Sequence, residues 1–376
     1  AGQAGYTAKR GGTVEHQGIQ GVFGLRAVVT REFDKALWSQ LLQSSSPTAY
    51  LESQEKYLSQ LDQFMGKTDA GANVASAIGD FDQALHALAT SPDDVSSKMA
   101  LLDKAQVLAS QLNQASSDVQ SLRTSVEAEI AGQVAAVNGL TQKIADLNSQ
   151  IVGQQNAGQD VTNLLDARDE AVRQLSTYTD IGTLENSEGH LSVFTTSGQA
   201  LVTDHATVLE FDARGTLTAN TEWSADDDER AVGTIRVAEG SQVIDLIGGG
   251  AFRSGSIAAL VELRDVTLVQ AQAQLDDIAA GLAEAMSNHT VDGSAVTSGS
   301  SSGFDVDLTG LQQGNRVTLS YTDTVTGKAK TVTLVRVDDA SRLPLDDSAT
   351  PDANDQVYGI DFSSGAATAA AQIQAA

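Results

Sequence analysis

The clearest pattern in the sequence is a long apolar repeat in its first half. From Leu101 onward, apolar residues recur mostly every three or four positions, which is the spacing of a heptad seam on one face of a helix. Its members are Leu101, Ala105, Leu108, Leu112, Ala115, Val119, Leu122, Val126, Ile130, Val134, Val137, Leu140, Ile144, Leu147 and Ile151. The steps of four between Leu122 and Val134 resemble a stutter. The segment predicts a rod of about 75–80 Å.

Shorter helical patterns stand on either side of this rod. One face is expected to carry Phe33, Leu37 and Leu41 and, after a break at Pro47, Leu51, Leu58 and Leu61. A short helix is expected over 78–88, ending before Pro92. The later stretch "NLLDARDEAVRQL" predicts a helix that Asn163 caps, with Asp166 completing a capping box and Asp169 pairing with Arg173.

From Ile181 the apolar period changes to two, which predicts strands. "LSVFTTSGQALV" indicates a hairpin turning at Ser197-Gly198, and "IRVAEGSQVIDLIGGG" continues the pattern. "RVTLSYTDTVTGKAKTVTLVRV" indicates another hairpin, turning at Thr326-Gly327. "DGSAVTSGSSSG" is expected to be a linker, and "SSGAATAAAQIQAA" is of low complexity.

Between the two β-rich parts the helical period returns. Its apolar stripe is Ile257, Leu260, Leu263, Val266, Val269, Ala273, Leu275, Ile278 and Leu282. The order of elements predicts an elongated α+β protein, in which a long antiparallel helical shaft carries inserted antiparallel β-rich domains. The expected parts are a lead-in (1–30), the first part of the shaft (31–180), a β-rich insertion (181–254), a returning shaft helix (255–290) and an incomplete outer β-rich domain (291–376). The shaft and the returning helix should pack together, because the apolar stripe of each would face solvent if that helix stood alone.

Composition narrows the classes of partner. The formal net charge is -26, from 23 basic and 49 acidic residues, so nucleic acid and anionic membrane surfaces are not expected partners. The chain has no cysteine, which removes disulfide and thiolate chemistry. No apolar run approaches the length of a membrane-spanning helix, and the N-terminus lacks the apolar core of a signal peptide.

The stretch "IDLIGGGAFRSGSIAALVELRD" has the order of a strand, a glycine-rich loop and a helix, which is how many proteins hold phosphate. The Walker form needs lysine after its last glycine, where this chain has Ser256. The dinucleotide form needs a third glycine where Arg253 stands. We therefore interpret Gly248 to Gly250 as a sharp turn from sheet to shaft and expect no nucleotide to bind.

Other candidate sites also lack their required context. Gly299 to Gly303 matches the spacing of a nucleophile elbow but follows a serine-rich stretch. Asp305 begins a calcium-loop pattern whose twelfth position is Arg316, and the acidic run from Asp226 to Glu229 is typical of a solvated loop. Asp166, Asp169 and Glu170 suit the first turns of a helix. The five histidines, at His16, His86, His190, His205 and His289, have no ligand spacing. We predict no catalytic, cofactor or metal residues, and therefore no enzyme.

Several stretches resemble one family in the same order along the chain. "AGQAGYTAKR" resembles the N-terminal signature of flagellar axial proteins, matching at Gly5, Tyr6 and Thr7, although Ala4 replaces the usual proline. "GVFGLRAVVTREFDKALWSQLLQSSS", "NLLDARDEAVRQLS", "GGGAFRSGSIAALVELRD" and "MSNHTVDG" are similar to segments of the flagellar hook-associated protein 1 family (FlgK family). The resemblance covers about residues 1–305, and little is recognisable beyond Gly303.

This resemblance implies a structural protein of the bacterial flagellum whose helical shaft is similar to that of flagellin. It implies export by the type III apparatus, secretion, and self-assembly into a ring at the hook–filament junction. It implies contacts with hook protein and with the second hook-associated junction protein, and an export chaperone that binds a terminal segment absent here. It also implies terminal helices beyond both ends of the given sequence. Two alternatives stay open: another axial protein (hook protein or the second junction protein), or an extracellular hydrolase carried on a helical stalk, which would need its site within 291–376.

Overall fold

The computed structural model describes residues 7–17, 23–66, 73–226, 228–239, 242–287, 294–298, 301–305, 310–322, 327, 329–339, 341, 343–345, 355–363 and 365–375. The chain divides into two compact units, Ala1–Ala279 and Ala280–Ala376. The boundary between them falls inside the last long helix, α6 (Leu268–Ser287). The division of the sequence into five parts stays a prediction. The N-terminal signature residues Gly5 and Tyr6 lie outside the described residues.

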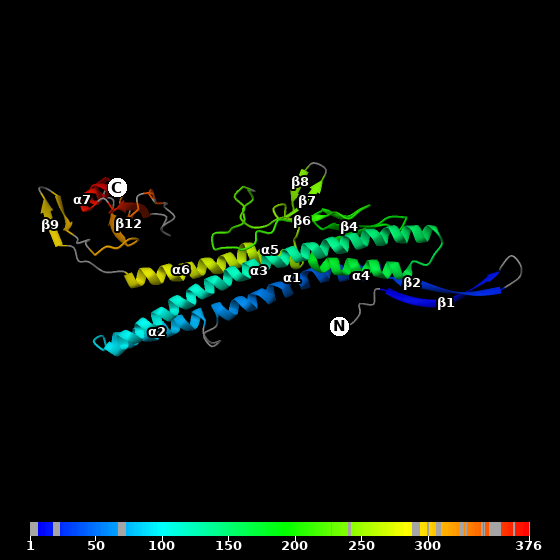
Figure 1. The fold of residues 1–376 in the computed structure, drawn as a ribbon, viewed down its shortest axis with the longest axis horizontal. Coiled ribbons are helices and arrows are strands. Elements are labelled where there is room, and N and C mark those ends of the chain that lie inside the picture. The colour runs from blue at the N-terminus through cyan, green and yellow to red at the C-terminus, as the bar shows by residue number, and fades with distance from the viewer. Residues whose placement is uncertain are drawn as a thin grey trace. The chain divides into compact units, whose positions relative to one another are not determined.

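The first unit combines long helices with short antiparallel sheets (Figure 1). Its helices are α1 (Lys35–Met65), α2 (Val74–Thr90), α3 (Val95–Asn156), α4 (Thr162–Tyr178), α5 (Ser256–Glu262) and α6, with a π turn at Leu263–Thr267 between the last two. Its strands are β1 (Thr7–Gln17), β2 (Phe23–Phe33), β3 (Ile181–Glu185), β4 (Leu191–Thr195), β5 (Ala200–Val202), β6 (Leu209–Phe211), β7 (Ile235–Glu239) and β8 (Gln242–Asp245). The sheets run in the orders β1-β2, β3-β4-β5 and β6-β7-β8. The expected lead-in is therefore a hairpin, because β1 and β2 pair over their whole length.

Helix α3 is the predicted rod. It has 62 residues, or about 93 Å at 1.5 Å per residue. Asp94 caps it by accepting the backbone N–H groups of Ser96 and Ser97. The predicted seam is confirmed from Leu108 to Ile151, where every member is buried except the half-buried Leu140. None of the helices in the described ranges is both long and apolar enough to cross a membrane.

Helix α1 corrects two predictions. The helix continues through Pro47 instead of breaking there. Near the proline, the Ser45 hydroxyl donates to the Leu41 carbonyl and the Thr48 hydroxyl donates to the Ser44 carbonyl. The buried face is also one residue away from the predicted one, since Trp38 and Leu42 are buried while Leu37, Leu51 and Leu58 are exposed. The sequence offers two neighbouring apolar stripes, and the buried one carries Trp38, whose ring centroid lies 5.9 Å from that of Phe33.

The start of α4 also differs from the prediction. The helix begins at Thr162, so Asn163 lies inside its first turn and is not the cap. Asp160, just before the helix, accepts the backbone N–H and the hydroxyl of Thr162 instead. Arg173 pairs with Glu170, whose pKa is lowered because the guanidinium bonds that carboxylate.

The returning helix packs on the shaft as predicted, since α5 contacts α1, α3 and α4. After Leu263 its predicted stripe is confirmed only in part: Leu275 is buried, while Val266 and Ala273 are exposed. Leu268 and Ala271, which were not in the predicted stripe, are buried. A π turn adds one residue to a helical turn and so rotates the following residues by about 100° relative to a continuous helix. The insertion keeps the apolar side of α6 on the same face as that of α5.

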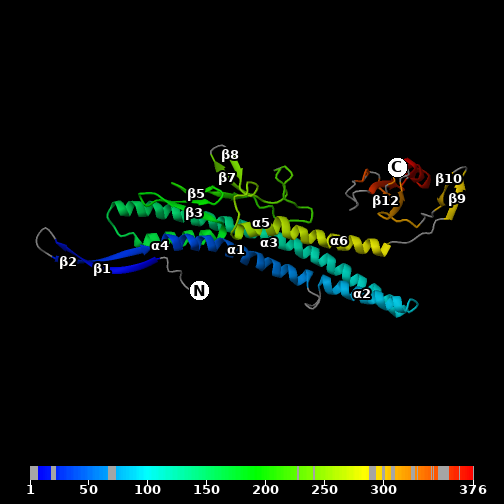
Figure 2. The ribbon, with the colours of Figure 1, turned by 180° about the vertical axis from the view of Figure 1, so that it is seen from behind.

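Figures 1 and 2 show β3 to β8 lying along one side of α3 and α1 along the other. The predicted turn at Ser197-Gly198 is confirmed, with β4 and β5 antiparallel and Gly198 at φ 99°. Strands β7 and β8, which the continued β pattern predicted as strands, pair antiparallel with each other. These sheets bury apolar residues such as Val193, Leu201, Val232 and Ile235.

The second unit contains a hairpin, a three-stranded sheet and a short helix. Its elements are β9 (Ser294–Ser298), β10 (Ser301–Asp305), β11 (Arg316–Thr322), β12 (Ala329–Val337), β13 (Asp355–Asp361) and α7 (Ala366–Ala375). The predicted linker therefore contains a strand pair, and the low-complexity end forms a helix that packs through Ala369 on Leu334 and Ile360. The β11–β12 hairpin is confirmed, although Thr326 of its turn lies outside the described residues. The sheet is mixed, because β13 pairs parallel to β12 where only antiparallel pairs were predicted.

Candidate functional site: the polar face of the long helix

Helix α3 carries a row of polar side chains beside its apolar seam. The row, which we call the polar face of α3, consists of Arg123, Thr124, Glu127, Asn138 and Asn148. Arg123 and Asn148 are fully buried, and Glu127 is 1% exposed. A buried polar group is costly unless it is hydrogen-bonded. The bonds of this face therefore decide how the β-rich chain is held on the shaft.

Each of two asparagine side chains bonds both the N–H and the carbonyl group of one strand residue. The Asn138 side chain donates to the Leu209 carbonyl and accepts from its N–H, both at 2.8 Å. Asn148 makes the same pair with Leu191, at 2.8 and 3.1 Å. Leu191 begins β4 and Leu209 begins β6, so the helix fixes the first residue of one strand in each sheet.

Glu127 occupies the centre of the polar face. Its Oε1 atom accepts the backbone N–H groups of Arg214 and Gly233, each at 3.0 Å. Its Oε2 atom pairs with the guanidinium of Arg264 at 2.5 Å. A Cβ at Gly233 would lie 2.6 Å from Oε1, so this close approach of the backbone requires glycine.

Arg264 lies on the π turn and is fully buried. Besides Glu127, its Nη1 donates to the Gly233 carbonyl at 2.8 Å, and Nε and Nη2 form a two-pronged pair with Asp265 at 2.7 and 2.8 Å. Burial by itself lowers the pKa of the guanidinium, but the bonds and charges of Asp265 and Glu127 outweigh it and hold that pKa above its usual value. The π turn thus places a permanent cation between two carboxylates.

Arg123 joins the same cluster to the loop that follows β6. Its Nε donates to the Arg264 carbonyl at 3.3 Å, and its Nη1 and Nη2 donate to the carbonyls of Thr218 and Thr221. Burial lowers the pKa of this guanidinium. The loop from Asp212 to Thr234 is held to α3 and to the π turn together, so three segments distant in sequence share one ionic cluster.

A third buried arginine lies near the C-terminal end of α3. Arg168 of α4 donates to Asn148 at 3.2 Å, to the Gly189 carbonyl at 2.7 Å and to Glu185 at 2.8 Å. The exposed fraction of its side chain is only 3%. Sheet β3-β4-β5 is therefore fixed to two helices through one guanidinium and one amide.

The glycine loop forms a turn closed by the protein's own carboxylate. Asp245 Oδ1 accepts the N–H groups of Ile247 and Gly248, each at 3.0 Å, and Gly250 has φ 64°. Gly249 and Ala251 donate their N–H groups to the carbonyls of Asp245 and Leu246. The backbone donors that would cradle a phosphate are thus already bonded inside the turn.

Calorimetric titration of the chain with ATP and magnesium, and with NAD, should therefore show no heat above dilution. The reason is that a phosphate would have to displace the Asp245 carboxylate from Ile247 and Gly248. A micromolar affinity for either nucleotide would contradict the assignment of this loop as a turn.

Asp245 also predicts a pH dependence of stability. Burial by itself raises the pKa of its carboxyl, but bonds from Thr234 and Gly248 and the charge of Arg230 lower it overall. A carboxyl whose pKa is lower in the folded state stabilises the fold above its unfolded pKa, near 3.9, and loses that effect as pH falls. Asp245→Asn should lower the unfolding free energy at pH 7, and its difference from the parent chain should shrink towards pH 3 in urea titrations. The exposed Asp204→Asn is the control, and a constant difference for Asp245→Asn would contradict the prediction.

Comparison with known proteins covers this same part of the chain. The family model of the "Flagellar hook-associated protein FlgK helical domain" matches residues 58–305, which include all of α3 and the polar face. The chain belongs to the FlgK family. This match also decides against the other axial proteins that the N-terminal signature left open.

Individual FlgK relatives agree with the family match. Flagellar hook-associated protein 1 of Salmonella typhimurium is 24% identical over 268 residues, which is 70% of this chain and 46% of that protein. The Bacillus subtilis protein of the same name is 29% identical over 168 residues, 44% of this chain and 31% of that one. The structure of the flagellar hook junction protein FlgK from Burkholderia pseudomallei matches with a TM-score of 0.53 and 29% identity, over 65% of this chain and 42% of that one. The chain thus spans about half the length of the relatives it matches.

The FlgK fold places the other candidate residues apart from one another. Ser301, the serine of the elbow-like stretch, begins β10 of the β9–β10 pair, and the next element in the described part of the chain is the strand β11. Asp226 accepts from the Asp228 backbone in a turn, and Asp227 lies outside the described residues, as do His289 and part of the calcium-like pattern after Asp305. His86 pairs with Asp82 on an exposed helix face. In the described ranges no three metal-ligating side chains form a group.

Sequence reasoning did not identify the polar face of α3, although a signal for it exists. Most of its members directly follow a residue of the apolar seam: Leu122–Arg123, Val126–Glu127, Val137–Asn138 and Leu147–Asn148. When only the apolar seam of a helix is covered, the residues next to the seam face solvent. In this protein the β-rich segment covers the face of α3 beside the seam as well. The π turn that supplies Arg264 had no recognised signal.

Proposed function

We propose that this chain is part of a structural axial protein of the bacterial flagellum that forms the hook–filament junction by self-assembly. The observation that supports this is the family match over residues 58–305, which takes in the shaft and the ionic cluster that ties the β-rich segment to it. A subunit of a rotating filament must transmit force between neighbours without coming apart internally. Buried charge pairs and two-way amide bonds hold its parts in one arrangement.

The partners proposed for the whole protein follow from the same role. They are further copies of itself in a ring, the hook protein, the second hook-associated junction protein, and an export chaperone that binds a terminal segment. We propose that it is secreted through the type III apparatus, works outside the cell and catalyses no reaction. Its net charge of -26 is consistent with avoiding nucleic acid and anionic membranes.

A chimera tests this proposal. In cells that lack their own hook-associated protein 1, residues 58–305 of this chain would replace the matching part of the Salmonella typhimurium relative. We expect attached filaments and motility to return. If the chimera is exported in normal amounts and resists trypsin, but flagellin is still shed into the medium, the junction role is wrong.

A further inference from the structure

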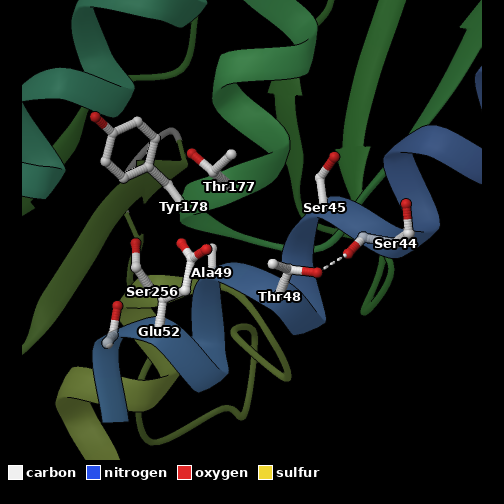
Figure 3. Close-up of a pocket in the computed structure, with 9 residues that line it drawn as sticks. Ser44, Ser45, Thr48, Ala49, Glu52, Thr177, Tyr178 and Ser256 are labelled. Atoms are coloured by element: carbon white, nitrogen blue, oxygen red, sulfur yellow. Dashed lines mark hydrogen bonds between the residues drawn. The ribbon is translucent and has the colours of Figure 1, made fainter. Parts of the chain in front are cut away.

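A surface pocket lies where α1, the end of α4 and the start of α5 meet (Figure 3). Its volume is about 490 Å³, and it is open to solvent on one side. Most of its lining residues carry a polar group, among them Ser44, Ser45, Thr48, Glu52, Thr177 and Ser256, although their carbon atoms make about half of the exposed lining apolar. Neither the polar face of α3 nor the glycine turn uses it.

Five of the hydroxyl groups in this lining already donate their protons within the protein. Ser44 and Ser45 donate to the Leu41 carbonyl, and Thr48 donates to the Ser44 carbonyl. Thr177 and Ser256 donate to Gln174 and Gln133. A hydroxyl has one donor and two acceptor positions, so these side chains have only oxygen lone pairs left for a ligand.

Glu52 is the one acidic residue among those that line the pocket, and the lining contains no lysine, arginine or histidine. Within the residues that the structure describes, its carboxylate makes no hydrogen bond or ion pair. Figure 3 shows it beside Ser256 and near the end of α4, while the Tyr178 hydroxyl points away from the other labelled side chains. The C-terminus of α4 meets the N-terminus of α5 closely, since a Cβ at Gly255 would lie 2.4 Å from the Tyr178 carbonyl. The opposite partial charges of these two helix ends offset each other. The sign of the electrostatic potential in the pocket is therefore set by the Glu52 side chain.

We propose that this pocket binds the cationic end of an arginine or lysine side chain from a neighbouring protein. A pocket that offers acceptors and one carboxylate, but few free donors, matches a guanidinium or ammonium group, which carries donors only. Its open side admits a side chain on its aliphatic stem, and Ala49 supplies an apolar surface for that stem. The inference does not depend on the flagellar role, because it rests on the lining chemistry alone.

Amide chemical shifts of the isotope-labelled chain test this inference directly. N-acetyl-arginine methylamide should shift the signals of Ser44, Thr48 and Thr177 in a saturable way. The citrulline analogue, which has the same shape without the charge, should not. Glu52→Gln should weaken arginine binding about tenfold, the loss expected for one charge-assisted bond.

Glu55→Gln is the matched control, because it removes the same charge from an exposed position one turn along α1. It should leave the affinity nearly unchanged, and unaltered thermal unfolding would show that both variants keep the fold. Equal shifts with citrulline, equal losses in the two variants, or the absence of saturable shifts would each overturn the assignment.

Discussion

Glu127→Ala should lower the free energy of unfolding of the first unit by about 3–5 kcal/mol, the usual cost of breaking a buried ion pair. The change removes the partner of Arg264 Nη1 and leaves the backbone N–H groups of Arg214 and Gly233 without their acceptor. Arg264 keeps Asp265, so the remaining charge is compensated in part and the unit should still fold. Urea titration followed by tryptophan fluorescence measures it, because both tryptophans, Trp38 and Trp223, lie within residues 1–279.

Asp80→Ala is the control for this prediction. It removes the same charge from α2, where the Asp80 side chain is 50% exposed and pairs with Lys104 of α3 at 2.7 Å. Surface pairs of this kind contribute about 0–1 kcal/mol. If the two variants lose similar stability, the cluster around Arg264 does not hold the β-rich segment to the shaft.

Gly255→Ala should also be costly, by about 3–5 kcal/mol. Gly255 has φ 90° and ψ 173°, a backbone region that is nearly restricted to glycine. A Cβ there would lie 2.4 Å from the Tyr178 carbonyl oxygen and 2.6 Å from the Thr179 nitrogen. Because both contacts are with backbone atoms, the steric clash can be relieved only if the end of α4 and the start of α5 move apart.

Gly250→Ala separates the two causes of that loss. Gly250 also has a positive φ, at 64°, but no atom lies within 4 Å of its added Cβ. Its replacement should cost only the left-handed backbone penalty of about 1–2 kcal/mol. Thermal unfolding of both variants, again followed by tryptophan fluorescence, checks the difference. Equal losses would show that the close approach of α4 and α5 contributes nothing to stability.

The sequence by itself determined the elements whose signal is local and repeated. The α3 seam from Leu108 to Ile151 was readable because each member needs only the 3.6-residue period to share a face with the next. The β4–β5 hairpin was readable from a period of two and from the turn residue Gly198, and the same period indicated the strands β7 and β8. The order of elements and several quoted stretches also led to the FlgK family, which the family match then showed.

Only the tertiary structure decided which of two adjacent faces is buried. In α1 the choice of Trp38 over Leu37, and in α6 of Leu268 over Val266, depends on what lies opposite each helix. The polar face of α3 was hidden for the same reason. A side chain such as Glu127 is typical of a solvated surface until a backbone from more than eighty residues away brings it N–H groups and a guanidinium. Burial is a property of contacts between distant segments, and a short sequence window contains only one side of each contact.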